Sequence, residues 1–335
     1  MAAFLRLEDA TVRIACFDLG SNATRFLMAE WRCGELNEIA IGGEITSLAD
    51  ALDESGYLHF NGLKRSLNAL MQFVKRARKL NVQPVCILAT AALRDARNGR
   101  EVADAIHDHI GVPVVILPPD AEAKLSFRGA LSKLPIPTDT LPQIALADVG
   151  GRSMEIVIGG INGSIERLES LPIGSQRLTH QFISHHPIPL EQQRLVRNAI
   201  RKALRHLRTP LQHCEHLIGA GGTATTLAML DQRLSKFSMV AIHGYKLSRE
   251  RVVKWSHQLA RLSIPDCERL PGMERGRERV IWAGAAIVAC IMSLGEFEQV
   301  IISGRCLMHG ALEHLLHHNI KLDCAQAIQT ALMNV

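Results

Sequence analysis

Two short stretches of the chain place an aspartate at the end of an apolar run, directly before a glycine turn. They read "DLGSN" at 18–22 and "DVGG" at 148–151. Glycine lacks a Cβ and tolerates positive φ, so the N–H groups of such a turn can converge on an anion. The aspartate would repel phosphate directly, and its functional role would be to hold Mg²⁺ or to orient a water. Each turn alone is also typical of an ordinary hairpin, but the matched pair favours phosphate chemistry.

A third glycine turn lies at 219–223, where "GAGGT" follows a short apolar run and opens a helical pattern. The N-terminus of a helix is a site that favours anions. Neither of the two aspartate–glycine turns is followed by the G-K-[ST] of a nucleotide P-loop.

The elements around these turns repeat in the same order in both halves of the chain. Strand-like runs at 12–17, 24–31 and 35–45 are joined tightly and should be antiparallel, and helix–strand alternation follows from a helix at 61–80. The pattern restarts with strand-like runs at 144–148, 153–158 and 164–171, and a long, mostly apolar helix is expected at 276–294, before a last strand, turn and helix. A proline-rich segment, 134–143, separates the halves. The sequence therefore predicts an internal duplication.

Composition narrows the class of protein. The chain has 335 residues, 47% apolar and 21% charged, which favours a folded core of about two domains. No apolar run reaches the roughly 18 residues of a membrane span, and we see no secretory signal. The eight cysteines are scattered, so we expect reduced thiols in a cytoplasmic protein. A net charge of +5 suits an anionic ligand but does not choose among nucleic acid, nucleotide and polyphosphate.

Five stretches carry a resemblance to a known family: "DLGSNATR", "ATAALRDARNG", "PPDAEAKLSFRG", "DVGGRSMEIVIG" and "GAGGTATTLA". Their order and spacing resemble those of the Ppx/GppA exopolyphosphatases and guanosine pentaphosphate phosphohydrolases, within the sugar kinase, Hsp70 and actin superfamily. The resemblance implies two duplicated ribonuclease H-like α/β domains, each with a mixed sheet, and an active site in the cleft between them. It implies an actin-like ATPase-type domain at 1–134 and a second at 135–305. The C-terminal helix at about 306–335 would pack back on the first domain.

The resemblance also implies roles for individual residues. Glu122 matches the base that activates the attacking water, and Arg94 matches an arginine that binds phosphate at the catalytic centre. Asp148 and Glu155 match the acidic pair that holds Mg²⁺ or another divalent cation, with Asp18 as a further candidate. The positions that match phosphate-binding loops are Gly20, Ser21, Asn22, Gly150, Gly151, Arg152, Ser153, Gly221, Gly222 and Thr223.

Several positions depart from the family pattern. Arg152 stands in place of a loop glycine, and its guanidinium could add a phosphate contact or block the approach of phosphate. Pro118 and Pro119 replace a Ser-Gly pair, and Ala121 replaces the first of two glutamates. Ala23 and Ser303 also differ from the usual residues. These departures leave a weakly active or inactive sensor of polyphosphate or an alarmone as an alternative.

The leading hypothesis is a bacterial, cytoplasmic exopolyphosphatase that removes terminal phosphate from inorganic polyphosphate with Mg²⁺ and water. The alternative enzyme hydrolyses the 5′ γ-phosphate of guanosine pentaphosphate. Arginines recur at three- and four-residue spacing along 194–208, which indicates either a solvated basic face or a track for a polyanion. We expect no membrane and no specific nucleic acid as partner. The resemblance adds a homodimer as one implied state, because family members often dimerise.

Overall fold

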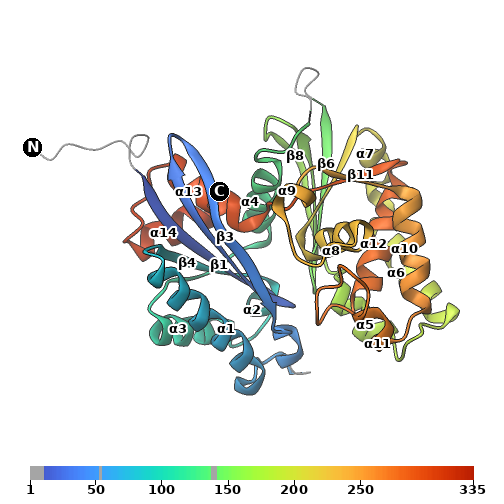
Figure 1. Ribbon diagram of the computed structural model, residues 1–335, viewed down its shortest axis with the longest axis horizontal. Coiled ribbons are helices and arrows are strands. Elements are labelled where there is room, and N and C mark those ends of the chain that lie inside the picture. Colours follow the sequence, from blue (N-terminus) through green and yellow to red (C-terminus); the bar gives the residue numbers. More distant parts are fainter. Residues whose placement is uncertain (1–10, 53–54, 137–141) are drawn as a thin grey trace, which may run out of the picture. The chain divides into compact units, whose positions relative to one another are not determined.

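A computed structural model describes residues 11–52, 55–136 and 142–335 (Figure 1). The N-terminal stretch 1–10 and residues 137–141 of the proline-rich segment lie outside the described ranges. The chain divides into two compact units. Unit 1 comprises residues 1–125 and 307–335, and unit 2 comprises residues 126–306.

Unit 1 is built on a five-stranded mixed sheet in the order β3-β2-β1-β4-β5. The three strands β1 (Val12–Leu19), β2 (Ala23–Arg32) and β3 (Glu35–Ile45) form an antiparallel meander. Strand β4 (Gln83–Ala89) then pairs parallel to β1, and β5 (Val114–Ile116) pairs parallel to β4. Short turns connect the antiparallel strands, whereas the parallel strands need crossover connections.

Unit 2 repeats this connectivity. The strands β6 (Gln143–Val149), β7 (Met154–Gly160) and β8 (Ile165–Leu171) form a second meander. Strand β9 (His216–Ala220) pairs parallel to β6, and β11 (Gln299–Ile302) pairs parallel to β9. One strand is added, because β10 (Tyr245–Ser248) pairs antiparallel to β11 at the edge. The predicted duplication is confirmed, and each unit has the mixed-sheet α/β architecture of the actin-like ATPase fold.

The alternation of side chains along β1 gives the sheet of unit 1 two apolar faces. Ala15, Phe17 and Leu19 pack with helices α1 (Phe60–Lys79) and α3 (Gly99–Ile110). Ile14 and Cys16 face the opposite way and pack with α13 (Leu307–His317) and α14 (Ala325–Met333). Figure 1 shows these two helices next to the sheet. The first turn of α4 (Pro119–Leu131) contributes to this second cluster through Ala121.

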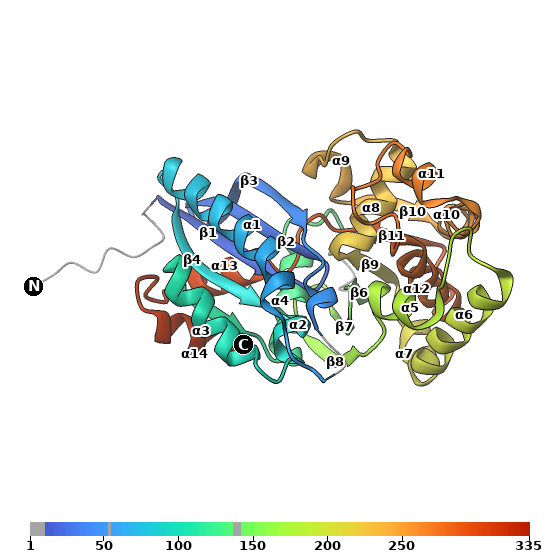
Figure 2. The ribbon, with the colours of Figure 1, turned by 90° about the horizontal axis from the view of Figure 1, so that it is seen from below.

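The helices of unit 2 share one core with its sheet. The larger ones are α5 (Ser175–Phe182), α6 (Leu190–Leu204), α8 (Gly221–Gln232), α10 (Arg249–Arg261) and α12 (Ile281–Leu294). Helix α12 is buried along most of its length and lies beside both α6 and α10 (Figure 2). The short helices of unit 2 are α7 (Arg208–Gln212), α9 (Met239–Ile242), α11 (Ile264–Glu268) and the 3₁₀ turn η2 (Arg205–Leu207). Those of unit 1 are α2 (Ala91–Arg94) and the 3₁₀ turn η1 (Leu48–Ala51).

The expected start of the last long helix of unit 2 is wrong. We expected it at Gly276, but α12 begins at Ile281. Gly276 has a φ of 92°, which is incompatible with a helix, and its N–H donates to the carboxylate of Glu278. The polar residues before Ile281 therefore form turns.

All eight cysteines lie in the described ranges, and none forms a disulfide bond. Within those ranges, no helix combines the length and apolar character needed to cross a membrane.

Candidate active site

The turn between β6 and β7 in unit 2 is held by backbone hydrogen bonds from a second loop. Gly150 N donates to Ser153 O at 3.0 Å and closes the hairpin. At the start of α5, Ser175 N donates to Gly150 O at 2.9 Å and Arg177 N donates to Gly151 O at 3.0 Å. These contacts use the carbonyls of the turn and so fix its path before any ligand binds.

Gly174 is a residue of this site that the sequence analysis missed. A Cβ at this position would lie 2.3 Å from Gly151 O and 2.5 Å from Arg152 N, so only glycine allows the two loops to approach. The glycine–serine pair at 174–175, where α5 begins, was the available signal. It could not be distinguished from an ordinary helix start, because its partner lies more than 20 residues earlier in the chain.

The turn between β9 and α8 completes the set of loops in unit 2. Gly221 has a φ of +77°, and a Cβ there would lie 2.4 Å from Oδ1 of Asp148. The hydroxyl of Thr223 donates to Val149 O at 3.2 Å. The N-terminus of α8 therefore lies against the end of β6, where its N–H groups and dipole favour negative charge. Unit 2 thus brings together the predicted loop residues of 150–153 and 221–223 with Asp148.

Asp148 and Glu155 are directly opposite each other in the β6–β7 ladder, so their side chains lie on the same face of the sheet. Glu155 is only 3% exposed, and the hydroxyl of Ser170 donates to its Oε1 at 2.9 Å. Two carboxylates at directly opposed positions repel each other unless a cation lies near them. Carboxylate oxygens are also the ligands that Mg²⁺ prefers.

Two carboxylates fit a magnesium ion better than they fit a metal whose ligands all come from protein side chains. Among the described residues, no three or more His, Cys, Asp or Glu side chains are grouped as a metal centre. Magnesium commonly takes only one or two protein carboxylates and completes its shell with waters and substrate phosphates. Asp18, the further candidate, lies on the sheet of unit 1 and not on that of Asp148 and Glu155.

The corresponding turn of unit 1 has the same closure. Gly20 N donates to Ala23 O at 3.1 Å. The carbonyl of Asn22 accepts from the N–H groups of Thr46 and Ser47, at 3.0 and 2.9 Å. The side-chain nitrogen of Asn22 is buried and has no hydrogen-bond partner in the part of the chain that the structure describes. A buried amide donor left in this state favours an acceptor that arrives with a ligand.

Glu122 and Arg94 lie together in unit 1. The Arg94 Nη1 donates to Glu122 Oε2 at 2.6 Å and to Leu117 O at 3.0 Å. The side chain of Arg94 is 17% exposed and that of Glu122 is 11% exposed, so the pair is largely buried but accessible to a ligand. Pro119 begins α4, a position where its missing N–H costs no helical hydrogen bond, and Glu122 N bonds back to Pro118 O at 3.0 Å. The proline pair is therefore compatible with a well-formed helix start ahead of Glu122.

Asn98, which follows Arg94 in the same motif, has a structural contact. Its side chain accepts from Leu58 N at 2.9 Å and donates to Leu58 O at 3.1 Å. The amide is thus used to hold the segment before α1.

A polar network anchors the far end of α8. Asp231 accepts from Tyr245 at 2.6 Å, from Trp255 at 2.8 Å and from Arg251 at 2.6 Å. Burial acts to raise the pKa of Asp231, but these hydrogen bonds outweigh it and hold the pKa below its usual value. Burial and the Asp231 carboxylate raise the pKa of Tyr245 to about 12. The helix whose first turn carries Thr223 is therefore tied to β10 and α10.

Comparison with known proteins agrees with this architecture. Exopolyphosphatase 2 of Mycobacterium tuberculosis is 29% identical over 293 residues, which cover 83% of this chain and 89% of that protein. A Ppx/GppA protein of Aquifex aeolicus is 27% identical, with a TM-score of 0.76 over 93% of this chain and 100% of that structure. An exopolyphosphatase structure from Cytophaga hutchinsonii is 23% identical, with a TM-score of 0.83 over 92% of this chain and 99% of that structure, and supports the fold. Residues 28–319 match the Ppx/GppA phosphatase family as a whole, and the chain therefore belongs to that family.

Proposed function

We propose that this chain is an exopolyphosphatase that hydrolyses the terminal phosphate of inorganic polyphosphate. The observation that carries the proposal is the opposed pair Asp148 and Glu155 beside the glycine turns at 150–151 and 221–222 of the same unit. Backbone N–H groups suit the equatorial oxygens of phosphate, and the carboxylates suit the cation that accompanies it. The similarity to Exopolyphosphatase 2 supports polyphosphate as the substrate class.

In this proposal Glu122 is the general base. Its carboxylate takes a proton from water while the water oxygen forms a bond to the terminal phosphorus. The bridging P–O bond then breaks, and the shortened chain leaves with the electron pair of that bond. Arg94 orients the carboxylate of Glu122 through its 2.6 Å hydrogen bond, and the same guanidinium has further N–H groups that suit phosphate oxygens.

Asp148 and Glu155 would hold Mg²⁺ in this proposal. A divalent cation neutralises the charge that develops on phosphate oxygens and screens their repulsion of the attacking water. The loop residues of 20–22, 150–153 and 221–223 would bind phosphate oxygens, with Arg152 adding a guanidinium to the second loop.

The experiment measures phosphate release from polyphosphate, guanosine pentaphosphate and ATP by wild type and by Glu122→Gln. Glutamine keeps an acceptor for Arg94 but cannot take a proton, so kcat should fall by a factor of about 10² to 10⁴. The matched control is Asp120→Asn, because Asp120 is an exposed acid in the same first turn of α4. Its activity should remain within about twofold of wild type.

Three results would overturn parts of the proposal. Equal rates for wild type and Glu122→Gln would reject Glu122 as the base. Faster release from guanosine pentaphosphate than from polyphosphate would select the second enzyme. Tight binding of polyphosphate with no release from any substrate would mean that the chain is a sensor.

A further inference from the structure

A broad groove runs along the outer helices of unit 2, with a volume of about 960 Å³. Helix α6 and the residues after it form one wall, α10 forms the other, and α12 forms the floor. Five basic side chains line the first wall: Arg197, Arg201, Lys202, Arg205 and Arg208. Arg208 follows Arg197 by eleven positions of nearly continuous helix, a rise of roughly 17 Å.

No carboxylate in the described part of the chain pairs with the five basic side chains of this groove, and none of the described residues that line it is acidic. Arg197 has a contact of another kind, with its guanidinium carbon 6.0 Å from the ring centre of the buried Trp282. Other arginines of unit 2 are paired: Arg249 with Glu298, Arg251 with Asp231 and Arg269 with Asp266. The groove therefore concentrates positive charge and would attract an anion from a distance.

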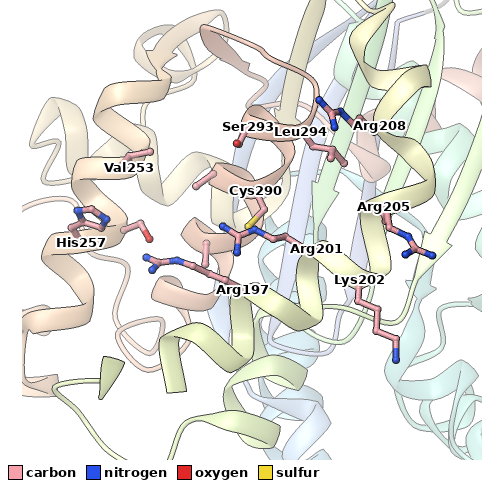
Figure 3. Close-up of a pocket in the computed structure, with 13 residues that line it drawn as sticks. Arg197, Arg201, Lys202, Arg205, Arg208, Val253, His257, Cys290, Ser293 and Leu294 are labelled. Atoms are coloured by element: carbon pink, nitrogen blue, oxygen red, sulfur yellow. The ribbon is translucent and has the colours of Figure 1, made fainter. Parts of the chain in front are cut away.

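The close-up shows how the groove is arranged (Figure 3). Arg197 reaches from α6 toward His257 of α10, Arg201 lies over Cys290 on the floor, and Lys202 points away from them. Burial raises the pKa of Cys290, while the guanidiniums of Arg201 and Arg197 act to lower it, which places all three side chains in one electrostatic environment.

A second observation points to a polar ligand. Ser256 lines the groove from α10 and is 2% exposed. Its hydroxyl is buried and has no hydrogen-bond partner among the residues that the structure describes. A buried hydroxyl in this state favours a polar group from outside the chain.

We propose that this groove is a binding site for the chain of inorganic polyphosphate, at phosphates remote from the one that is hydrolysed. The proposal rests on the proposed function for its substrate class. A row of cations over roughly 17 Å matches a flexible chain of repeated negative charges better than it matches a single phosphate. Single-stranded nucleic acid binds by stacking its bases on exposed aromatic rings, and the described lining contains no Phe, Tyr or Trp.

The first test measures affinity by anisotropy of a fluorescently labelled polyphosphate. Arg197→Gln/Arg201→Gln should weaken the affinity about tenfold and lower the salt dependence of binding by about two charges. The control is Lys254→Gln/Arg261→Gln, which removes two positive charges from α10 at exposed positions that do not line the groove. An equal loss in both variants would reduce the effect to net charge and reject the site.

The second test locates the ligand and does not depend on hydrolysis. Cys290 lines the groove, whereas Cys33 is exposed in unit 1, so alkylation at both positions can be followed by mass spectrometry in one sample. Saturating polyphosphate should slow alkylation of Cys290 at least fivefold and leave Cys33 unchanged. Unaltered alkylation of Cys290 would overturn the proposal, even if the chain hydrolyses polyphosphate.

The remaining outcomes separate this site from the catalytic one. If polyphosphate protects Cys290 but the protein releases no phosphate from it, the result would support the groove as a binding site and reject the proposed function. Single-stranded RNA that protects Cys290 at the same concentration of phosphate groups would mean that the groove accepts any polyanion, and would overturn the assignment to polyphosphate.

Discussion

The two aspartate–glycine turns of this protein have the same backbone but different charge environments. In each, the first glycine N–H donates to a carbonyl three residues later, at 3.1 Å for Gly20 and 3.0 Å for Gly150. A Cβ would meet that same carbonyl at 3.0 Å and 2.9 Å. Across the ladder, however, Asp18 is opposite Arg25, whereas Asp148 is opposite Glu155.

The two copies therefore retain the same backbone closure at the glycine but differ in the residue opposite the aspartate. The close approach at the glycine depends on backbone sterics, so it persists in both copies. The cross-strand position has no such constraint, and there the copies differ by a full reversal of charge. Asp18 has an arginine at the opposed position within its own hairpin. Asp148 has a second acid there, and this arrangement suits a bound cation.

The largest effect that would test this comparison is the loss of Asp148. We expect Asp148→Asn to lower Mg²⁺-dependent phosphate release about 100-fold and to weaken Mg²⁺ binding by a similar factor. The matched change in the other copy, Asp18→Asn, should cost about tenfold or less, because Arg25 already faces that carboxylate. Activity is followed over a magnesium titration, and Mn²⁺ binding by calorimetry gives a readout that is independent of turnover.

Equal losses of Mn²⁺ affinity in the two variants would break the comparison, because both aspartates would then act as metal ligands. Unchanged affinity in Asp148→Asn would remove the opposed pair of unit 2 as the metal site.

The duplication itself was predictable from local patterns. Apolar runs, short glycine-bearing turns and helix–strand alternation are encoded within a few residues, and the three meander strands of each unit lie close to their predicted ranges. The aspartate–glycine turns could be found for the same reason. Helix α10 was missed, because its polar exposed face and charged residues obscure its buried positions Val252, Leu259 and Ala260.

Contacts between distant segments could not be predicted in the same way. The approach of Gly174 to Gly151 depends on how β8 returns past the β6–β7 turn, which no local pattern records. The basic spacing along α6 was visible, but its two interpretations could not be separated from sequence. The described residues of the facing helices α10 and α12 that line the groove include no acid, and this supports the proposed polyanion site.

The network around Asp231 provides a prediction of intermediate size, because it fixes α8, the helix whose first turn lies against the aspartate–glycine turn of unit 2. The side chain of Asp231 is 3% exposed and accepts three hydrogen bonds. Replacing it with Asn should lower the free energy of unfolding of unit 2 by about 2 kcal/mol at pH 7. Urea unfolding followed by tryptophan fluorescence in a Trp31→Phe background, where Trp255 and Trp282 of unit 2 are the two remaining tryptophans, measures this change.

The pH dependence of that difference follows from the depressed pKa of Asp231. The stability that its charge contributes is fully present above the unfolded pKa, near 4, and is lost as pH falls through the lower folded pKa. The difference in free energy of unfolding between wild type and Asp231→Asn should therefore become smaller below about pH 4. The control Glu298→Gln breaks an exposed pair with Arg249 of the same unit and should change stability by about 0.5 kcal/mol or less. A gap that stays constant down to pH 3 would contradict the role of the charge.

The smallest effect concerns Arg152, the residue at which the turn of unit 2 departs most from its counterpart in unit 1. Its carbonyl accepts from Nε of Arg177 at 3.0 Å, and this backbone contact survives any change of side chain. Arg152→Gly should therefore keep the turn and remove only the guanidinium, lowering kcat/KM for polyphosphate about threefold through one lost partly exposed phosphate contact. Arg152→Lys, which keeps the charge but not the planar fork, should give an intermediate value. Steady-state rates at fixed Mg²⁺ measure the series, and a rise of tenfold or more in Arg152→Gly would mean instead that the arginine obstructs phosphate at a turn otherwise built like that of unit 1.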